Sequence, residues 1–164
     1  MIRTYINAFQ IGIIAGMRSM MAPAFVSYKL SHASSRPLVD SKLHFLVSPK
    51  ATMALELMAG GELIGDKLPN TPDRTAQPQL WGRIASGAMC GAALTEADNQ
   101  PIAYGAILGA LGAAAGTFAF FHLRHWLTHE KDVPDTLVAL AEDALAIGAG
   151  LVLINDEKFG SLTA

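Results

Sequence analysis

The chain has 164 residues, of which 51% are hydrophobic and only 16% are Asp, Glu, Lys or Arg. A typical soluble domain is about 25% charged, so this chain is short of charge, while its apolar content excludes a disordered chain. The formal net charge of −2 excludes broad electrostatic binding of nucleic acid, and the single cysteine, Cys90, excludes an internal disulfide framework or a multi-cysteine metal site.

The apolar segments predict an all-α fold of five helices, because Gly, Ala, Met and Leu dominate them and β-branched residues are few. In chain order the predicted helices cover about 4–28, 50–66, 79–95, 101–127 and 134–155. Polar or proline-rich segments separate them, and Pro101 is placed to open the fourth helix. If all five cross a membrane, the N-terminus and segment 66–80 lie on one side and segment 29–50 lies on the other.

The segment from Asn99 to Phe121 has the length and composition of a membrane span. Its 23 residues include no Asp, Glu, Lys or Arg. A helix that rises about 1.5 Å per residue would cross a hydrocarbon layer of about 30 Å over this length. We therefore expect a single membrane domain over residues 1–164, a small polytopic helical bundle of about five spans, some short or broken. A soluble helical bundle is the alternative, because the other predicted helices are shorter or contain charges.

The spacing of the glycines indicates close helix packing. Gly105, Gly109, Gly112 and Gly116 follow at intervals of four, three and four, so they share one face of the fourth predicted helix. Small residues let helix backbones approach closely in a bilayer, either within one chain or in a homo-oligomer. Segments 12–24 and 82–94 also echo each other, each glycine-rich with one arginine, so an internal repeat is one interpretation and chance similarity is the other.

Charged residues within the predicted spans are the main functional candidates, because charge in a bilayer is costly and usually functional. Acids outnumber bases there by five to two: Glu56, Glu62, Asp66, Glu142 and Asp143 against Arg18 and Arg83. This surplus must be protonated, paired or matched to a cation. We expect a cation or proton site formed by Glu62, Asp66, Glu142 and Asp143, with Arg18, Lys67, Arg74 and Arg83 as charge partners. The alternative is that these groups lie at helix ends in the interfacial region and form structural ion pairs with Lys67, Arg74 and Arg124.

Three histidines share one face near the end of the fourth predicted helix: His122, His125 and His129. They are candidate metal ligands, but the neighbouring Trp126 favours an interfacial anchor. The sequence contains no phosphate-binding loop and places no base beside a nucleophile, so we expect no cofactor and do not favour an enzyme. A lipid-acting enzyme that uses Asp66 and Arg74 is a further alternative.

Four short motifs are spread along the chain: Gly16-Met17-Arg18 with Pro23, Glu62-Leu63-Ile64-Gly65-Asp66-Lys67-Leu68-Pro69 running to Pro72 and Arg74, Gly82-Arg83 with Gly87 and Gly91, and Ala141-Glu142-Asp143-Ala144. With these motifs nearly the whole chain resembles the uncharacterised prokaryotic integral-membrane family known as domain of unknown function 4126. The resemblance implies a multi-pass protein of the prokaryotic inner membrane and no particular activity. A second similarity is to small cation/proton exchangers with a Glu-x-Gly-Asp-Lys/Arg-Thr/Ser motif, although here the acids lie one residue further apart.

Two functional expectations follow from these observations. The first is a small transporter- or channel-like protein with an acidic cation or proton site inside the membrane. The second is a non-catalytic membrane scaffold or partner subunit whose buried charges are structural ion pairs. The two expectations differ in whether the four candidate acids converge on one cavity.

Overall fold

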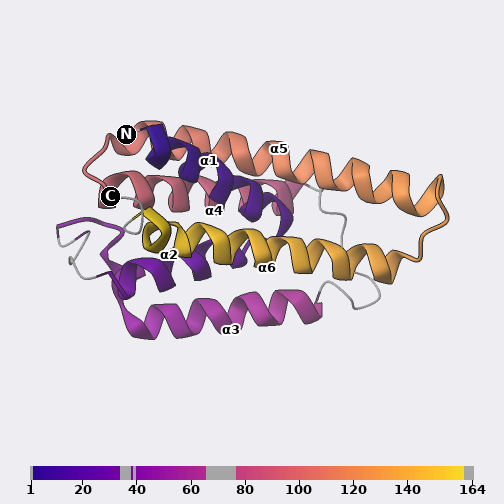
Figure 1. Ribbon diagram of the computed structural model, residues 1–164, viewed down its shortest axis with the longest axis horizontal. Helices are drawn as coiled ribbons and strands as arrows, with labels where there is room; N and C mark the ends of the chain where they lie inside the picture. Colours follow the sequence, from indigo (N-terminus) through magenta and orange to yellow (C-terminus); the bar gives the residue numbers. More distant parts are fainter. Residues whose placement is uncertain (1, 34–37, 39, 66–76, 161–164) are drawn as a thin grey trace.

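The computed structural model describes residues 2–33, 38, 40–65 and 77–160, and these residues form helices and turns but no strand (Figure 1). The predicted all-α fold is confirmed. The α-helices are α1 (Ile2–Met17), α2 (Met21–Ser31), α3 (Pro49–Gly65), α4 (Gln77–Ala97), α5 (Ile102–His129) and α6 (Asp135–Gly160), and a short 3-10 helix, η1 (His44–Val47), precedes α3. Helices α3 to α6 coincide with the last four predicted helices to within five residues at each end.

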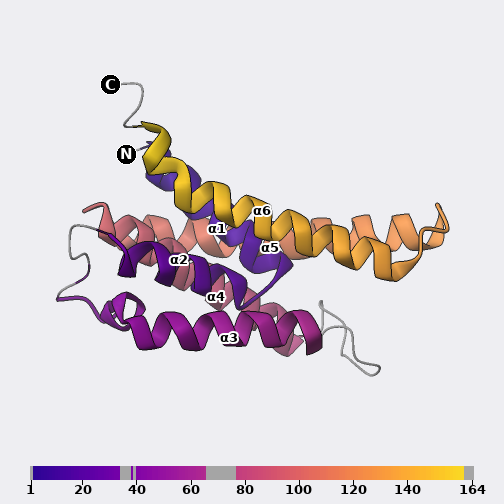
Figure 2. The same cartoon turned by 60° about the horizontal axis from the view of Figure 1, so that its bottom comes forward.

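The prediction of one continuous helix over 4–28 is wrong. The first helix stops at Met17, and α2 begins at Met21 and runs back along the bundle (Figure 2). Pro23 gives a physical reason for the interruption. It has no N–H to bond the carbonyl of Ser19, four residues earlier, and in a continuous helix its ring would clash with that carbonyl. In α2 the same proline lies in the first turn, where no intrahelical N–H bond is needed.

This reversal decides which segments lie at the same end of the bundle. Thr4 Oγ1 donates to Asp98 Oδ2 over 2.7 Å, and Ser41 Oγ donates to Glu96 Oε2 over 2.6 Å. The start of α1, the segment before α3 and the α4–α5 turn therefore share one end, on the left in Figure 1. The expectation that the N-terminus lies opposite segment 29–50 is wrong, because the turn between α1 and α2 adds a reversal.

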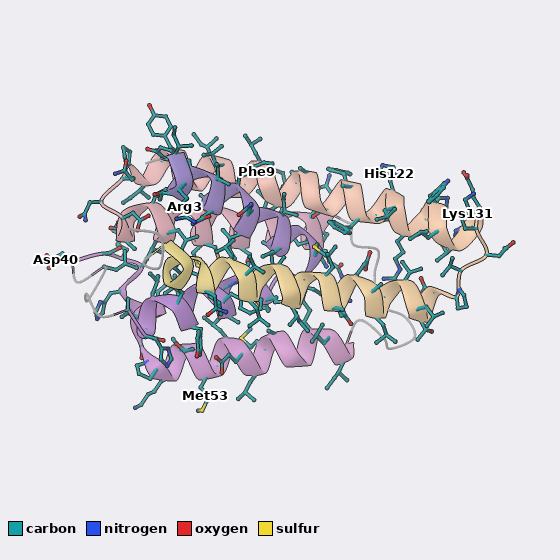
Figure 3. All side chains as sticks on the ribbon, viewed as in Figure 1. Arg3, Phe9, Asp40, Met53, His122 and Lys131 are labelled. Carbon is teal, nitrogen blue, oxygen red and sulfur yellow. The ribbon has the colours of Figure 1, made fainter. Side chains whose placement is uncertain are left out.

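Helices α5 and α6 form a long hairpin that projects past the ends of α3 and α4 (Figure 2). The 28 residues of α5 correspond to about 42 Å. His122 and Lys131 lie on the projecting part, whereas Arg3 and Asp40 lie toward the opposite end (Figure 3).

Glycines bring α1, α4 and α5 into backbone contact. A Cβ atom added to Gly109 of α5 would overlap the carbonyl oxygen of Gly87 in α4, and one added to Gly12 of α1 would overlap the carbonyl oxygen of Gly109. Segments 12–24 and 82–94, which are similar in sequence, differ in backbone conformation. Segment 12–24 is interrupted at the α1–α2 turn, whereas segment 82–94 lies within the unbroken α4.

The outer surfaces of several helices are apolar. Among the described residues, two helices have the length and apolar composition needed to cross a membrane: α5 and the Asp135–Asn155 part of α6. Only 28% and 39% of their most apolar 18-residue windows are buried, whereas a core helix of a soluble protein is mostly buried. On α3, Leu57 and Ile64 are each 71% exposed, and Met53 points away from the bundle (Figure 3). Large exposed apolar side chains on several helices are compatible with a membrane protein.

Candidate functional site

The α1–α2 turn, residues 16–20, lies a little past the middle of α5. Thr117, the sixteenth residue of α5, donates a hydrogen bond of 3.2 Å to the carbonyl oxygen of Gly16. The backbone groups of the turn have left the helical hydrogen-bond ladder, so they need other partners. Side chains of α3, α4 and α5 supply those partners.

Glu62 of α3 binds the backbone N–H groups just before α2. Its Oε1 accepts from the Ser19 N–H over 2.8 Å and from Ser19 Oγ over 2.7 Å, and its Oε2 accepts from the Met20 N–H over 2.8 Å. A carboxylate is favourable here because a helix N-terminus carries partial positive charge and hydrogen bonds to an ionised acceptor are strong. Glu62 therefore fixes the point at which α2 begins.

Arg83 of α4 has the complementary role at the end of α1. Its Nη1 donates to the carbonyl oxygens of Gly16 and Met17 over 2.7 and 2.8 Å. In a continuous helix those carbonyls would accept from residues 20 and 21 instead. The Arg83 side chain is buried, and its Nη2 lies 4.0 Å from Glu62 Oε1. A positive guanidinium thus meets the partially negative end of α1.

The carbonyl oxygen of Ser19, to which Pro23 cannot donate a hydrogen bond, also has a partner. Ser86 Oγ donates to Ser19 O over 2.6 Å. Ser86 follows Arg83 by three residues, so both side chains project from one face of α4 toward the turn. Ser19 and Ser86 are not among the residues predicted from the sequence to form the site. The four-residue interval between Ser19 and Pro23 is a local signal that the Ser19 carbonyl lacks its helical donor, whereas no local signal identifies Ser86 as the replacement.

Arg18 links the α1–α2 turn to α6. Its Nε and Nη2 lie 2.8 and 2.5 Å from Asp143 Oδ1. Arg18 is 1% exposed and Asp143 is 6% exposed, so water does little to stabilise either charge. Each group therefore depends on protein partners, and the ion pair joins the α1–α2 turn to α6, 125 residues later in the sequence.

A second arginine, Arg124 of α5, contacts two acids of α6. Its Nε and Nη2 bind Asp135 over 2.8 and 2.7 Å, and its Nη1 lies 3.5 Å from Glu142 Oε2. The Glu142 side chain is 6% exposed. Arg124 is the ion-pair partner near a helix end that the structural alternative names.

The structure arranges the candidate charges as separate pairs around the turn. Asp66, Lys67 and Arg74 lie outside the described residues. The other three candidate acids each lie beside an arginine: Glu62 beside Arg83, Glu142 beside Arg124, and Asp143 beside Arg18. Each of these three acids therefore has a positively charged neighbour, and Arg124 also binds Asp135.

Two open grooves flank α6, and none of these three acids lines either of them. One groove, of about 450 Å³, lies between α2, α3 and α6 and is lined by Glu56 among apolar side chains. The other, of about 670 Å³, lies between α1, α5 and α6, and Gln10 is the polar residue in its lining. Glu62, Glu142 and Asp143 therefore do not converge on either groove.

Comparison with protein families, curated proteins and solved structures finds no match to this chain. The chemistry of the cluster is therefore judged from its geometry alone. Glu62 and Asp143 accept hydrogen bonds from this chain's own backbone and side chains, and Arg83 donates to helix carbonyls. Such an arrangement is suited to holding the α1–α2 turn in place between α3, α4 and α6.

The histidines near the end of α5 are not arranged as a metal site. The rings of His125 and His129 stack with centroids 4.1 Å apart, and His122 packs edge-on against Phe121. In the part of the chain that the structure describes, no three His, Cys, Asp or Glu side chains are grouped closely enough to hold a metal ion.

Substituting Glu62→Gln should weaken the α1–α2 turn. An amide offers one acceptor oxygen in place of two and brings an NH₂ group toward backbone donors, so the variant loses at least one hydrogen bond and leaves a backbone N–H without its acceptor. We expect a loss of about 1–3 kcal/mol in the free energy of unfolding. Thermal unfolding of the purified protein in detergent measures it. The exposed Glu130→Gln serves as control, and equal stability of the two variants would contradict the assigned role of Glu62.

Proposed function

We propose that this chain is a multi-pass protein of the prokaryotic cell membrane that acts as a non-catalytic scaffold or partner subunit, with structural ion pairs in its interior. The observation that carries this proposal is the pairing of Glu62, Glu142 and Asp143 with three arginines. These pairs bridge α3 to α4, α5 to α6, and the α1–α2 turn to α6. Removing one partner of a buried ion pair destabilises a protein strongly, because the other charge is left buried without compensation. Such pairs therefore favour the one helix arrangement in which both partners meet.

The exposed apolar surfaces of α3, α5 and α6 support the membrane location. The 17 residues of α3 and the 21 of α4 correspond to about 26 and 32 Å, close to the hydrocarbon thickness of about 30 Å. We infer four spans, α3 to α6, with α1 and α2 forming a hairpin that enters and leaves at one end. The end of α5 from His122 onward then extends beyond the hydrocarbon layer.

Membership of the prokaryotic family known as domain of unknown function 4126 is part of this proposal. It rests on the motifs around Arg18, Glu62, Arg83 and Glu142. Three of these residues also take part in the contacts that hold the α1–α2 turn, Arg18 and Glu62 directly and Arg83 at the end of α1. If members of the family have the same α1–α2 hairpin held by these charged residues, the motifs would occur together in them.

Three measurements test the proposal. Alkaline carbonate washing of membranes should leave the full chain in the membrane pellet, and recovery in the supernatant would contradict a multi-pass protein. Purified wild-type chain in proteoliposomes should show no proton or cation flux above empty vesicles, whereas Asp143→Asn should lower the yield of folded protein.

Transport of a cation or proton is the second candidate function. The observation in its favour is the interrupted helix pair, because transporters often place binding sites at discontinuous helices whose ends face charged groups. Flux in wild-type proteoliposomes that disappears in a well-folded Glu62→Gln variant would favour transport over the scaffold.

A further inference from the structure

Glu56 lines the groove between α2, α3 and α6 and differs from the acids around the α1–α2 turn. It lies in the middle of α3 and is exposed, and within the described part of the chain it makes no hydrogen bond or ion pair. The other groove-lining residues that can offer polar atoms are Tyr28 and Asn155. Apolar side chains of all three helices form the rest of the lining.

The composition of this groove selects for one class of ligand. A carboxylate among apolar groups at mid-helix depth is favourable only if it is protonated or matched by a cation. Divalent cations prefer six or more oxygen ligands, which this lining does not offer. An organic cation needs one carboxylate for its charge, apolar walls for its body, and aromatic rings, which Phe25 and Tyr28 add to the lining. The groove volume of about 450 Å³ lies within the usual range for small-molecule sites.

We propose that this groove binds a monovalent organic cation with an apolar body, and that Glu56 neutralises its charge. The site is separate from the ion pairs that hold the α1–α2 turn, so it goes beyond the scaffold role. The proposed binding site depends on the proposed membrane location in one respect, namely that the surroundings of Glu56 are apolar. Binding is measured on purified protein, so its failure is distinguishable from a failure of the membrane or scaffold tests.

The test uses tetraphenylphosphonium as the probe and equilibrium dialysis of the full chain in a non-ionic detergent. The wild type should bind one probe per chain saturably. Triphenylphosphine oxide, an uncharged molecule with similar aryl groups, should bind at least tenfold more weakly. Glu56→Gln should weaken tetraphenylphosphonium binding at least tenfold, because it removes the charge and keeps the shape. Glu130→Gln, which removes an equal charge at the end of α5, should bind as the wild type does.

A second variant tests the groove independently of the charge. Gly60 lines the groove, and a Cβ at this position would meet no atom within 4 Å, so Gly60→Leu should fold normally and fill part of the space. It should weaken binding although Glu56 is intact. The proposal is overturned by absent saturable binding in the wild type, by wild-type affinity in either groove variant, or by equal binding of the uncharged probe.

Discussion

Replacing Gly109 with alanine is expected to destabilise the protein by about 3 kcal/mol, the upper end of the usual range for overpacking. The added methyl group would overlap the Gly87 carbonyl oxygen of α4. Backbone atoms cannot move aside as a flexible side chain can, so α4 and α5 would have to separate. In a bilayer such a separation loses the close packing that holds the helices together. Thermal or denaturant unfolding of the purified protein in detergent measures the loss.

The matched control is the same substitution at a glycine that faces open space. A Cβ on Gly61 or Gly148 would have no atom within 4 Å. Both alanine variants should be neutral or more stable by up to about 1 kcal/mol, because alanine is the better helix former. If Gly109→Ala were as stable as these controls, the close approach of α4 and α5 would be contradicted.

Replacing Asp143 with asparagine should cost about 3–5 kcal/mol, the range measured when one partner of a buried ion pair is removed. Arg18 is 1% exposed, so its guanidinium would lose an ionic partner without gaining water. Removing both charges in the Arg18→Met/Asp143→Leu double variant should recover much of this loss. Unfolding of the single and double variants in one detergent provides the comparison.

Asp135→Asn is the control for the loss of an aspartate–arginine pair. Asp135 binds Arg124, but its side chain is 64% exposed. Water and salt screen such a pair, so we expect a change of no more than about 1 kcal/mol. A double variant less stable than Asp143→Asn would show that the ion pair is not the main contribution of these residues.

Helices α3 to α6 could be predicted from the sequence because each is an apolar segment bounded by polar or proline-containing turns. The α1–α2 turn was missed because apolar composition continues across it. The N–H groups of Ser19 and Met20 bond Glu62, some forty residues later, and local pattern does not reveal such a contact. Pro23 was the local sign of the break.

The candidate site was predicted in part. Arg18, Glu62 and Arg83 were singled out from the sequence, and all three contribute to the contacts around the turn. Their pairing was not predictable, because helical spacing specifies which residues share a face but not which helix lies opposite. Arg124, near the end of the fourth predicted helix, lies beside Glu142, a contact that the spacing of residues along the chain does not specify.

The chain reverses at Arg18–Met20, so the proposed membrane arrangement puts the N-terminus and segment 40–48 on one side of the membrane. Cysteine accessibility tests this directly. Three variants are made in a Cys90→Ala background, which removes the chain's single cysteine: Ile2→Cys, Lys42→Cys and Lys131→Cys, all at exposed positions. A membrane-impermeant maleimide is applied to intact cells and to inverted vesicles. We expect positions 2 and 42 to be labelled from one side and position 131 from the other. Labelling of position 2 together with 131, and opposite 42, would show that the first helix crosses the membrane without a reversal and would contradict this account.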